Sequence, residues 1–211
     1  MITYLKTRVK QLLPQKVKSW VRDLDRNQQI EIGGIKMWTP LINGMQCSVS
    51  EPWMIGLLQR LLRDQNGAFI DVGANLGQTL IKLRSVDCDR EYIGFEPNPA
   101  YAYYLNELIK INAFENARVL PFALLNRDQV LQIELAGQAD QGASLLADFR
   151  PKAGTHKVDV PVFCWNSIAH LFNFDRLAMI KIDVEGTELE VLKSLSKLIR
   201  THRPTVLLEV L

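Results

Sequence analysis

The sequence is poor in cysteine, has no long apolar run and has a net charge of only +2. Its three cysteines lie far apart and follow no metal-ligand spacing, which argues against a disulfide framework and a zinc site. No apolar run is long enough to span a membrane, and the N-terminus lacks the continuous apolar segment of a signal peptide. We therefore expect a cytoplasmic protein, and the low net charge gives no indication of a nucleic-acid partner.

Basic residues are concentrated at the N-terminus. Residues 1–30 hold seven Lys or Arg and two acidic residues, whereas the rest of the chain holds 18 basic and 21 acidic residues. The apolar spacing over residues 2–25 predicts one or two helices. Such a basic amphipathic segment either packs on the body of the protein or contacts a partner or an anionic membrane surface. With a hairpin that turns at Gly33–Gly34, it forms a predicted first unit over residues 1–49.

From residue 68 the pattern alternates between strand and helix. Strands are expected at 68–73, 90–96, 117–124, 178–184 and 205–211, with two more, at 129–135 and 158–164, that could pair with each other. Predicted helix caps are Ser50, Asn98 before Pro99, and Asn166. Strands separated by crossover helices predict an α/β fold with a doubly wound, mostly parallel sheet. Ligands bind such sheets at the carboxyl ends of the strands.

The segment DVGANLGQ (71–78) joins the first of these strands to its helix. Gly73 lets the backbone turn and lets a ligand approach closely, and Gly77 permits close packing of the helix on the strand. Asn75 tolerates the left-handed conformation that such a turn often needs. The helix N-terminus then offers N–H groups to an anionic ligand group. The Gly-x-Gly-x-x-Gly fingerprint of dinucleotide binding is absent.

Glu96 ends the second of these strands, 25 residues after Asp71. An acid near this position hydrogen-bonds ribose hydroxyls in doubly wound folds, and one carboxylate can accept both donors of a diol. The tyrosines of residues 100–108 are expected mainly to pack within the core, with one near Glu96 able to contact a base. Glu96 is therefore a candidate ligand-binding residue.

Three segments together resemble the FkbM family of class I S-adenosylmethionine-dependent methyltransferases: FIDVGANLGQ, GFEPNP and KIDVEGTELEVL. The resemblance covers residues 68–211 and implies that 50–211 is an S-adenosylmethionine-binding domain. It implies methyl transfer to a hydroxyl of a sugar, glycan or secondary metabolite. The cofactor-binding residues that it implies are Asp71, Gly73, Ala74, Asn75, Gly77 and Gln78, with Glu96 and Pro97 near the ribose and Ala123 and Leu124 near the adenine.

The strand in IKIDVEG carries a charge at every second position, so Lys181, Asp183 and Glu185 are expected on one face. Asp183 is the first candidate for orienting the acceptor or acting as base, followed by Glu185 and His156. Lys181 is expected to neutralise Asp183 or Glu209. The alternative is a purely ionic network in which Glu185 caps the next helix. Mg²⁺ at these acids has no other support, so no metal is predicted.

The sequence departs from the family pattern in two places. Asn166 stands where relatives often have an acid before a short helix. The sequence also ends at the fifth core strand, where class I sheets add two more, so we expect missing C-terminal strands and an exposed edge that favours self-association. A non-catalytic methyltransferase-like binding protein is the alternative function. An NAD(P)-dependent oxidoreductase is disfavoured by the missing fingerprint.

Overall fold

The computed structural model describes residues 27–135 and 156–209. The helices predicted within residues 2–25 lie outside these ranges. The core is a five-stranded parallel sheet in the order β10-β9-β3-β4-β5. The strand bounds are β3 Ala68–Val72, β4 Tyr92–Phe95, β5 Ala117–Leu120, β9 Leu177–Ile182 and β10 Thr205–Leu208. The prediction of a doubly wound parallel α/β sheet is confirmed.

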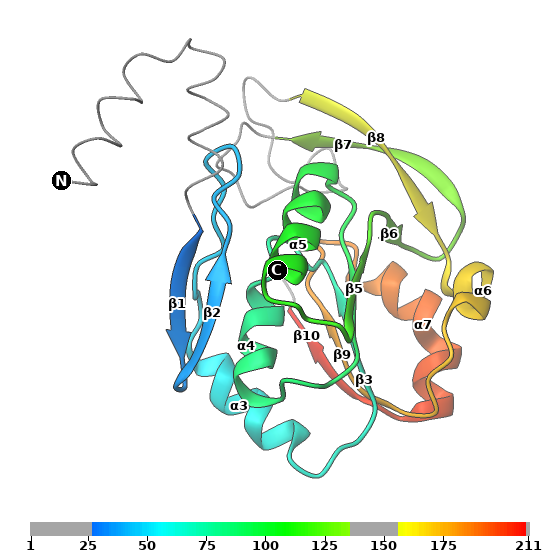
Figure 1. Ribbon diagram of the computed structural model, residues 1–211. Coiled ribbons are helices and arrows are strands. Elements are labelled where there is room, and N and C mark those ends of the chain that lie inside the picture. Colours follow the sequence, from blue (N-terminus) through cyan, green and yellow to red (C-terminus); the bar gives the residue numbers. More distant parts are fainter. Residues whose placement is uncertain (1–26, 136–155, 210–211) are drawn as a thin grey trace, which may run out of the picture.

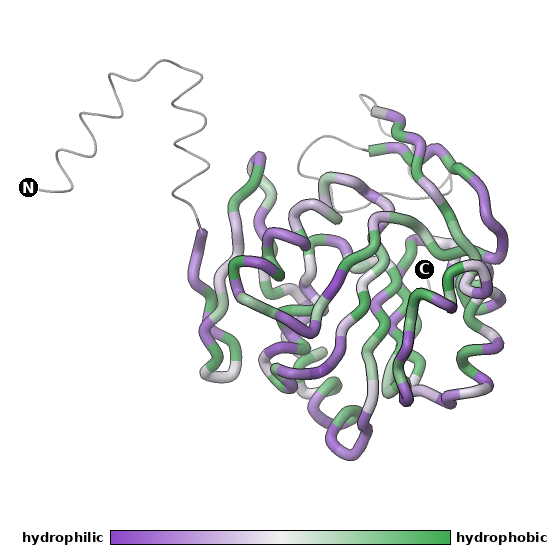
Figure 2. Tube along the Cα trace, turned by 45° about the vertical axis from the view of Figure 1, so that its right-hand side comes forward, coloured by the Kyte–Doolittle hydropathy of each residue, from purple (hydrophilic) through white to green (hydrophobic). Residues whose placement is uncertain are grey.

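Helices cover both faces of this sheet (Figure 1). One face packs against α3 (Trp53–Leu62), α4 (Gln78–Val86) and α5 (Pro99–Ile111), and the other against α6 (Trp165–Ile168) and α7 (Glu188–His202), with a 3₁₀ turn η1 (Ala169–Leu171) after α6. Apolar residues follow the central strands in Figure 2. β3 and β9 are buried at every position because each contributes side chains to both layers.

The chain winds outward from β3 in two directions. It passes through β4 to β5 on one side, and through β9 to β10 on the other. The switch point therefore lies between β3 and β9, where the connections at the carboxyl ends part and leave a crevice. A ligand site is expected at this edge.

Two smaller sheets border the core. The hairpin of β1 (Gln28–Ile32) and β2 (Ile35–Thr39) turns at Gly33–Gly34, as predicted, and is tied to α5 where the Tyr104 hydroxyl donates to Pro40 O at 2.7 Å. The other sheet has the order β6-β8-β7, made of β6 (Ala123–Leu124), β7 (Gln129–Leu135) and β8 (His156–Phe163). The predicted pairing of the latter two strands is confirmed and is antiparallel.

Three local predictions are wrong. The segment predicted as one strand over 117–124 is two strands, β5 and β6, in different sheets, because Pro121 interrupts it. Pro52, not Ser50, occupies the N-cap of α3. Cys164, not Asn166, occupies the N-cap of α6, where the distant Asp128 accepts hydrogen bonds from Cys164 N (2.7 Å) and the Ser167 hydroxyl (2.6 Å). The Asn98 cap is confirmed, since its side chain accepts from Ala100 N.

Candidate functional site

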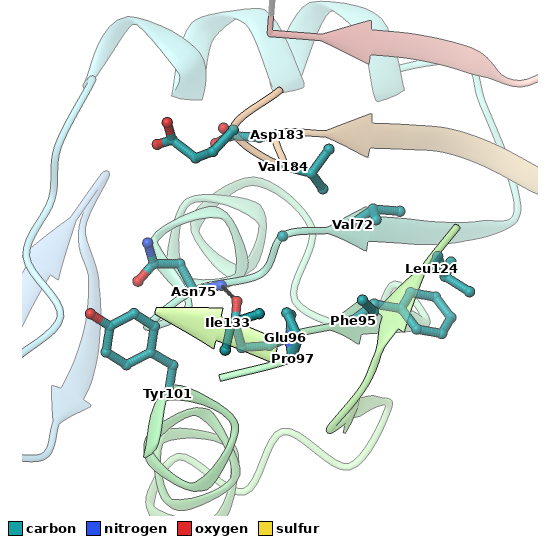
Figure 3. A pocket seen from close by; sticks show the side chains of 13 residues that line it. Val72, Asn75, Phe95, Glu96, Pro97, Tyr101, Leu124, Ile133, Asp183 and Val184 are labelled. Atoms are coloured by element: carbon teal, nitrogen blue, oxygen red, sulfur yellow. Dashed lines mark hydrogen bonds between the residues drawn. The ribbon is translucent and has the colours of Figure 1, made fainter. Parts of the chain in front are cut away.

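A pocket opens at the carboxyl edge of the core sheet, at the switch point, and holds about 700 Å³ of empty space, including the part open to solvent. Figure 3 shows Asp183 and Val184 entering from the β9 side and Glu96 and Pro97 from the β4 side. Most of the predicted cofactor residues line it, namely Gly73, Asn75, Glu96, Pro97, Ala123 and Leu124, together with Asp183 and Glu185. Four segments far apart in the sequence thus form one cavity.

The turn after β3 brings the backbone close to β9. Gly73 has φ 86°, and a Cβ there would lie 1.9 Å from Asp183 O, so only glycine fits. Asn75 has the predicted left-handed conformation (φ 50°), and its side chain accepts a hydrogen bond from Leu76 N at 2.7 Å. Gly77 is also tightly packed, but against Leu105 of α5 rather than against a strand.

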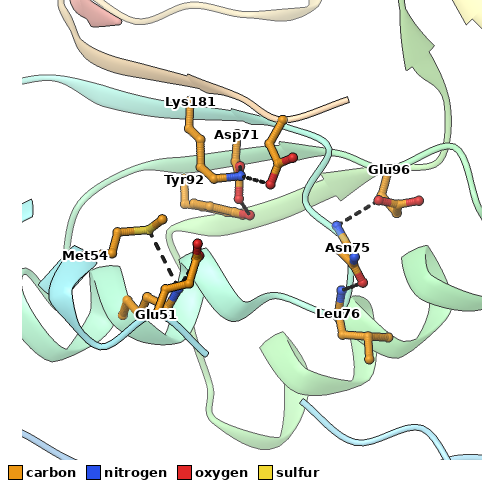
Figure 4. Close-up of polar contacts among 10 residues, drawn as sticks. Glu51, Met54, Asp71, Asn75, Leu76, Tyr92, Glu96 and Lys181 are labelled. Atoms are coloured by element: carbon orange, nitrogen blue, oxygen red, sulfur yellow. Dashed lines mark hydrogen bonds and ion pairs between the residues drawn. The ribbon is translucent and has the colours of Figure 1, made fainter. Parts of the chain in front are cut away.

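Glu96 is buried at the end of β4 and receives two backbone hydrogen bonds. Asn75 N donates to its Oε2 at 2.7 Å (Figure 4), and Asn98 N donates to its Oε1 at 2.8 Å. Burial raises the pKa of Glu96 to about 7, although these two hydrogen bonds lower it. The carboxylate is therefore fixed in direction, and each oxygen keeps a second lone pair for a ligand hydroxyl.

A chain of buried polar groups leads from the core to the pocket. The Tyr92 hydroxyl donates to Asp71 Oδ2 at 2.7 Å, and Lys181 Nζ lies 3.7 Å from Asp71 Oδ1 and 2.8 Å from Asp183 Oδ2. Asp71 and Lys181 are direct neighbours across β3 and β9, and Gly94 on β4 leaves room for the Tyr92 ring. The expected pairing of Lys181 with Asp183 is confirmed. Lys181 also pairs with Asp71, which was not predicted.

The buried charged groups in this series of contacts shift one another's pKa values. Burial raises the pKa of Asp71, while Lys181 and Tyr92 oppose the shift. Burial alone would lower the pKa of Lys181, but Asp71 and Asp183 raise it above its ordinary value. Lys181 is therefore a firmly charged ammonium between two carboxylates.

The segment that follows β9 is a turn rather than a continuation of the strand. Glu185 has φ 55° and Gly186 φ 109°, and Gly186 N donates to Glu188 Oε1 at 2.8 Å. The N-cap of α7 is Thr187, so the alternative in which Glu185 caps this helix is wrong. Within the described residues, no group of three or more His, Cys, Asp or Glu side chains could hold a metal ion.

Several predicted residues do not line the pocket. Asp71 and Lys181 lie behind its wall, Ala74 is buried against β4, and Gly77 and Gln78 begin α4. The backbone of His156 begins β8, and its side chain lies outside the described part of the chain.

Besides the predicted Pro97, Ala123 and Leu124, five further residues of the wall went unpredicted, apart from the expectation that one tyrosine near Glu96 could contact a base. They are Val72, Phe95, Tyr101, Ile133 and Val184. Tyr101 follows Asn98 by one helical turn, which is the signal that could have placed it near Glu96. No local pattern separates a pocket-lining Ile133 from an ordinary core residue.

A parallel α/β sheet with a pocket at its switch point defines a Rossmann-like fold. The model of the methyltransferase FkbM domain matches residues 71–211. The chain therefore belongs to the FkbM methyltransferase family.

None of the helices in the described ranges is long and apolar enough to cross a membrane.

Several known proteins are similar to the chain. The crystal structure of methyltransferase FkbM from Methylobacillus flagellatus KT has a TM-score of 0.48 and 19% identity, over 68% of this chain and 32% of that one. For precorrin-6y C5,15-methyltransferase from Geobacter metallireducens GS-15 the TM-score is 0.40 and the identity 12%, over 71% and 56% of the two chains. Cyclosporin synthetase of Tolypocladium inflatum is 32% identical over 76 residues, 35% of this chain and a share of that protein that rounds to 0%. The chain thus spans about a third of the FkbM structure and far less of the synthetase.

Proposed function

We propose that the chain binds S-adenosylmethionine in this pocket and catalyses methyl transfer to a hydroxyl group of a sugar, glycan or secondary metabolite. The observation that supports this most strongly is the buried Glu96 carboxylate, which lines the switch-point pocket and is oriented by two backbone N–H groups. Membership of the FkbM methyltransferase family supports the same activity.

The residues present fit this donor. Glu96 has free lone pairs for both hydroxyls of a ribose, and Gly73 lines the pocket directly after β3. The apolar side chains of Phe95, Leu124 and Ile133 provide a surface for an aromatic base. Gly73 and Asn75 would contact the methionine part.

When bound, S-adenosylmethionine supplies an electrophilic methyl group on a sulfonium. The tasks left to the protein are to align the acceptor and to remove its proton, which contribute several kcal/mol and about 10²–10⁴-fold in rate, respectively. Asp183 is the candidate for both tasks because its carboxylate lines the pocket and Lys181 holds it at 2.8 Å. Glu185 lines the same wall, and His156 stays a further prediction.

Calorimetric titration of the full chain with S-adenosylmethionine tests the proposal. We expect micromolar binding, at least tenfold weaker binding in Glu96→Ala, and none with NADH. Glu115→Ala is the matched control, because Glu115 is exposed in the turn after α5 and should leave the affinity unchanged. A folded protein that does not bind S-adenosylmethionine would contradict the proposal, whereas binding without methyl transfer to any hydroxyl acceptor would favour the non-catalytic alternative.

A further inference from the structure

The wall of the pocket is acidic. Three of its lining side chains are Glu96, Asp183 and Glu185, and the lining that the structure describes includes no Lys, Arg or His. The ammonium that pairs with Asp183 lies behind the wall: the side chain of Lys181 is 6% exposed, whereas that of Asp183 is 33% exposed. A ligand in the pocket therefore meets the carboxylate of this ion pair before the ammonium.

The carboxylate of Asp183 is held in place from the core. Lys181 Nζ binds it at 2.8 Å and lies 3.7 Å from Asp71, which is anchored in turn by the Tyr92 hydroxyl (Figure 4). Tyr92 and Asp71 are fully buried, so the chain of contacts has little freedom to move. One ammonium faces two carboxylates, and the excess negative charge is directed at the pocket.

This excess of negative charge raises the pKa of a neighbouring carboxyl group. The pKa of Glu209 is raised, first by the charge of Asp183 and then by burial and the charge of Glu51. Lys82, which is also buried, pairs elsewhere, 3.5 Å from Glu51. Within the ranges 27–135 and 156–209, these two lysines thus leave the negative charge of the pocket incompletely neutralised.

The sulfonium of the proposed donor connects its ribose to its methionine part. If Glu96 holds the ribose and Gly73 the methionine, the sulfonium lies between them, and the backbone of Gly73 is packed against Asp183 O. After transfer, the product S-adenosylhomocysteine has nearly the same shape but an uncharged thioether. A fixed carboxylate attracts the positively charged sulfonium of the donor but has no charge–charge attraction to the neutral thioether of the product.

We propose that Asp183, held by Lys181, makes the pocket discriminate by charge, so that it favours the sulfonium donor over the neutral thioether product. This inference rests on the proposed function. It assigns to Asp183 a specificity role that is separate from acceptor activation, and it implies that loss of the positive charge on transfer promotes product release.

Titration of the full-length chain with S-adenosylmethionine and with S-adenosylhomocysteine tests this role without any acceptor. We expect the ratio of the two dissociation constants to change about tenfold in Asp183→Asn, equal to about 1.4 kcal/mol, mainly through weaker binding of the sulfonium. The matched control is Asp175→Asn, the same substitution in the exposed segment before β9, at the opposite end of that strand. Its ratio should equal that of the wild type.

The outcomes separate the two proposals. If both ligands bind and the ratio is the same in Asp183→Asn and Asp175→Asn, the charge role is wrong while the donor site stands. If the folded wild type binds neither ligand, the proposed function itself fails. Should Asp183→Asn unfold, Glu185→Gln gives the same reading on the same wall, with a smaller expected change of about threefold that shrinks in 1 M salt.

Discussion

The two ends of the core sheet use buried polar groups differently. At the amino end, before β3, β4 and β9, Arg90 donates to Gly67 O (2.7 Å), Gln65 O (2.8 Å) and Asp87 Oδ2 (2.8 Å). Its guanidinium is thereby used to tie the loops together. At the carboxyl end, Glu96 and Asp183 are also held by specific partners, yet both face a pocket.

This difference separates structural from functional polar groups. At the amino end, the guanidinium and its acceptors satisfy one another, so we expect their removal to affect folding alone. At the carboxyl end, the protein bears the cost of a buried carboxylate, as the raised pKa of Glu96 shows, and under the proposed function this carboxylate binds the ligand. The predictions below test that contrast.

The largest effect is expected from Gly73→Ala at the carboxyl end. The added Cβ would lie 1.9 Å from Asp183 O, which is a backbone atom and cannot move aside without shifting β3 from β9. We expect a loss of about 4 kcal/mol in the free energy of unfolding, measured by urea denaturation, and loss of donor binding.

Gly34→Ala is the control, because Gly34 also has positive φ (82°) but no atom within 4 Å of the added Cβ. It should lose only about 1 kcal/mol from backbone strain. Equal losses in the two variants would mean that crowding at the switch point is not what requires Gly73.

The next effect is a pH dependence that belongs to Glu96. Its pKa is about 7 in the folded protein against an ordinary value of 4.5. Between pH 4.5 and about 7, the folded state therefore binds more protons at this group than the unfolded state does. Stability contributed by this group is therefore fully present below about pH 4.5 and is lost as pH rises to about 7. The loss is roughly 3 kcal/mol, at about 1.4 kcal/mol per pKa unit.

Urea denaturation of wild type and Glu96→Gln from pH 4.5 to 8 isolates the pH-dependent contribution of Glu96, as the difference between their unfolding free energies. The variant should lack it, whereas Glu115→Gln should keep it. Affinity for S-adenosylmethionine should rise over the same pH range in the wild type, because the ionised carboxylate accepts hydroxyl donors more strongly. Parallel pH curves for wild type and Glu96→Gln would show that Glu96 does not titrate in this range.

The smallest effect is expected at the amino end. Arg90→Ala removes one ion pair and two hydrogen bonds to carbonyl groups, so we expect a loss of about 2 kcal/mol in unfolding free energy. Affinity for S-adenosylmethionine should change less than twofold. The exposed Arg60 provides the control, and Arg60→Ala should change neither quantity. A tenfold loss of donor affinity in Arg90→Ala would remove the contrast between the two ends.

Prediction from sequence succeeded where the signal was local. The segments AFIDVG and AMIKIDV and the glycines of DVGANLGQ indicated the strands and the turn, and Asn98 before Pro99 marked the start of α5. The alternation of charges in IKIDVEG was misleading, because β9 ends at Ile182 and Glu185 lies in a turn. Prediction failed where contacts with residues distant in the sequence determine the local structure. The cap of α6 depends on Asp128, which lies 36 residues before Cys164. The split at Pro121 depends on which sheet each half joins.

The sequence by itself determined the parallel α/β sheet, the glycine turn and the carboxylates at the strand ends, because periodicity and backbone preference act between near neighbours. Only the tertiary structure decided which charges meet. Tyr92, Asp71 and Lys181 come from three strands, and their order in the sheet sets the contacts that lead to Asp183. Burial, which depends on every layer around them, then fixed how strongly those charges act.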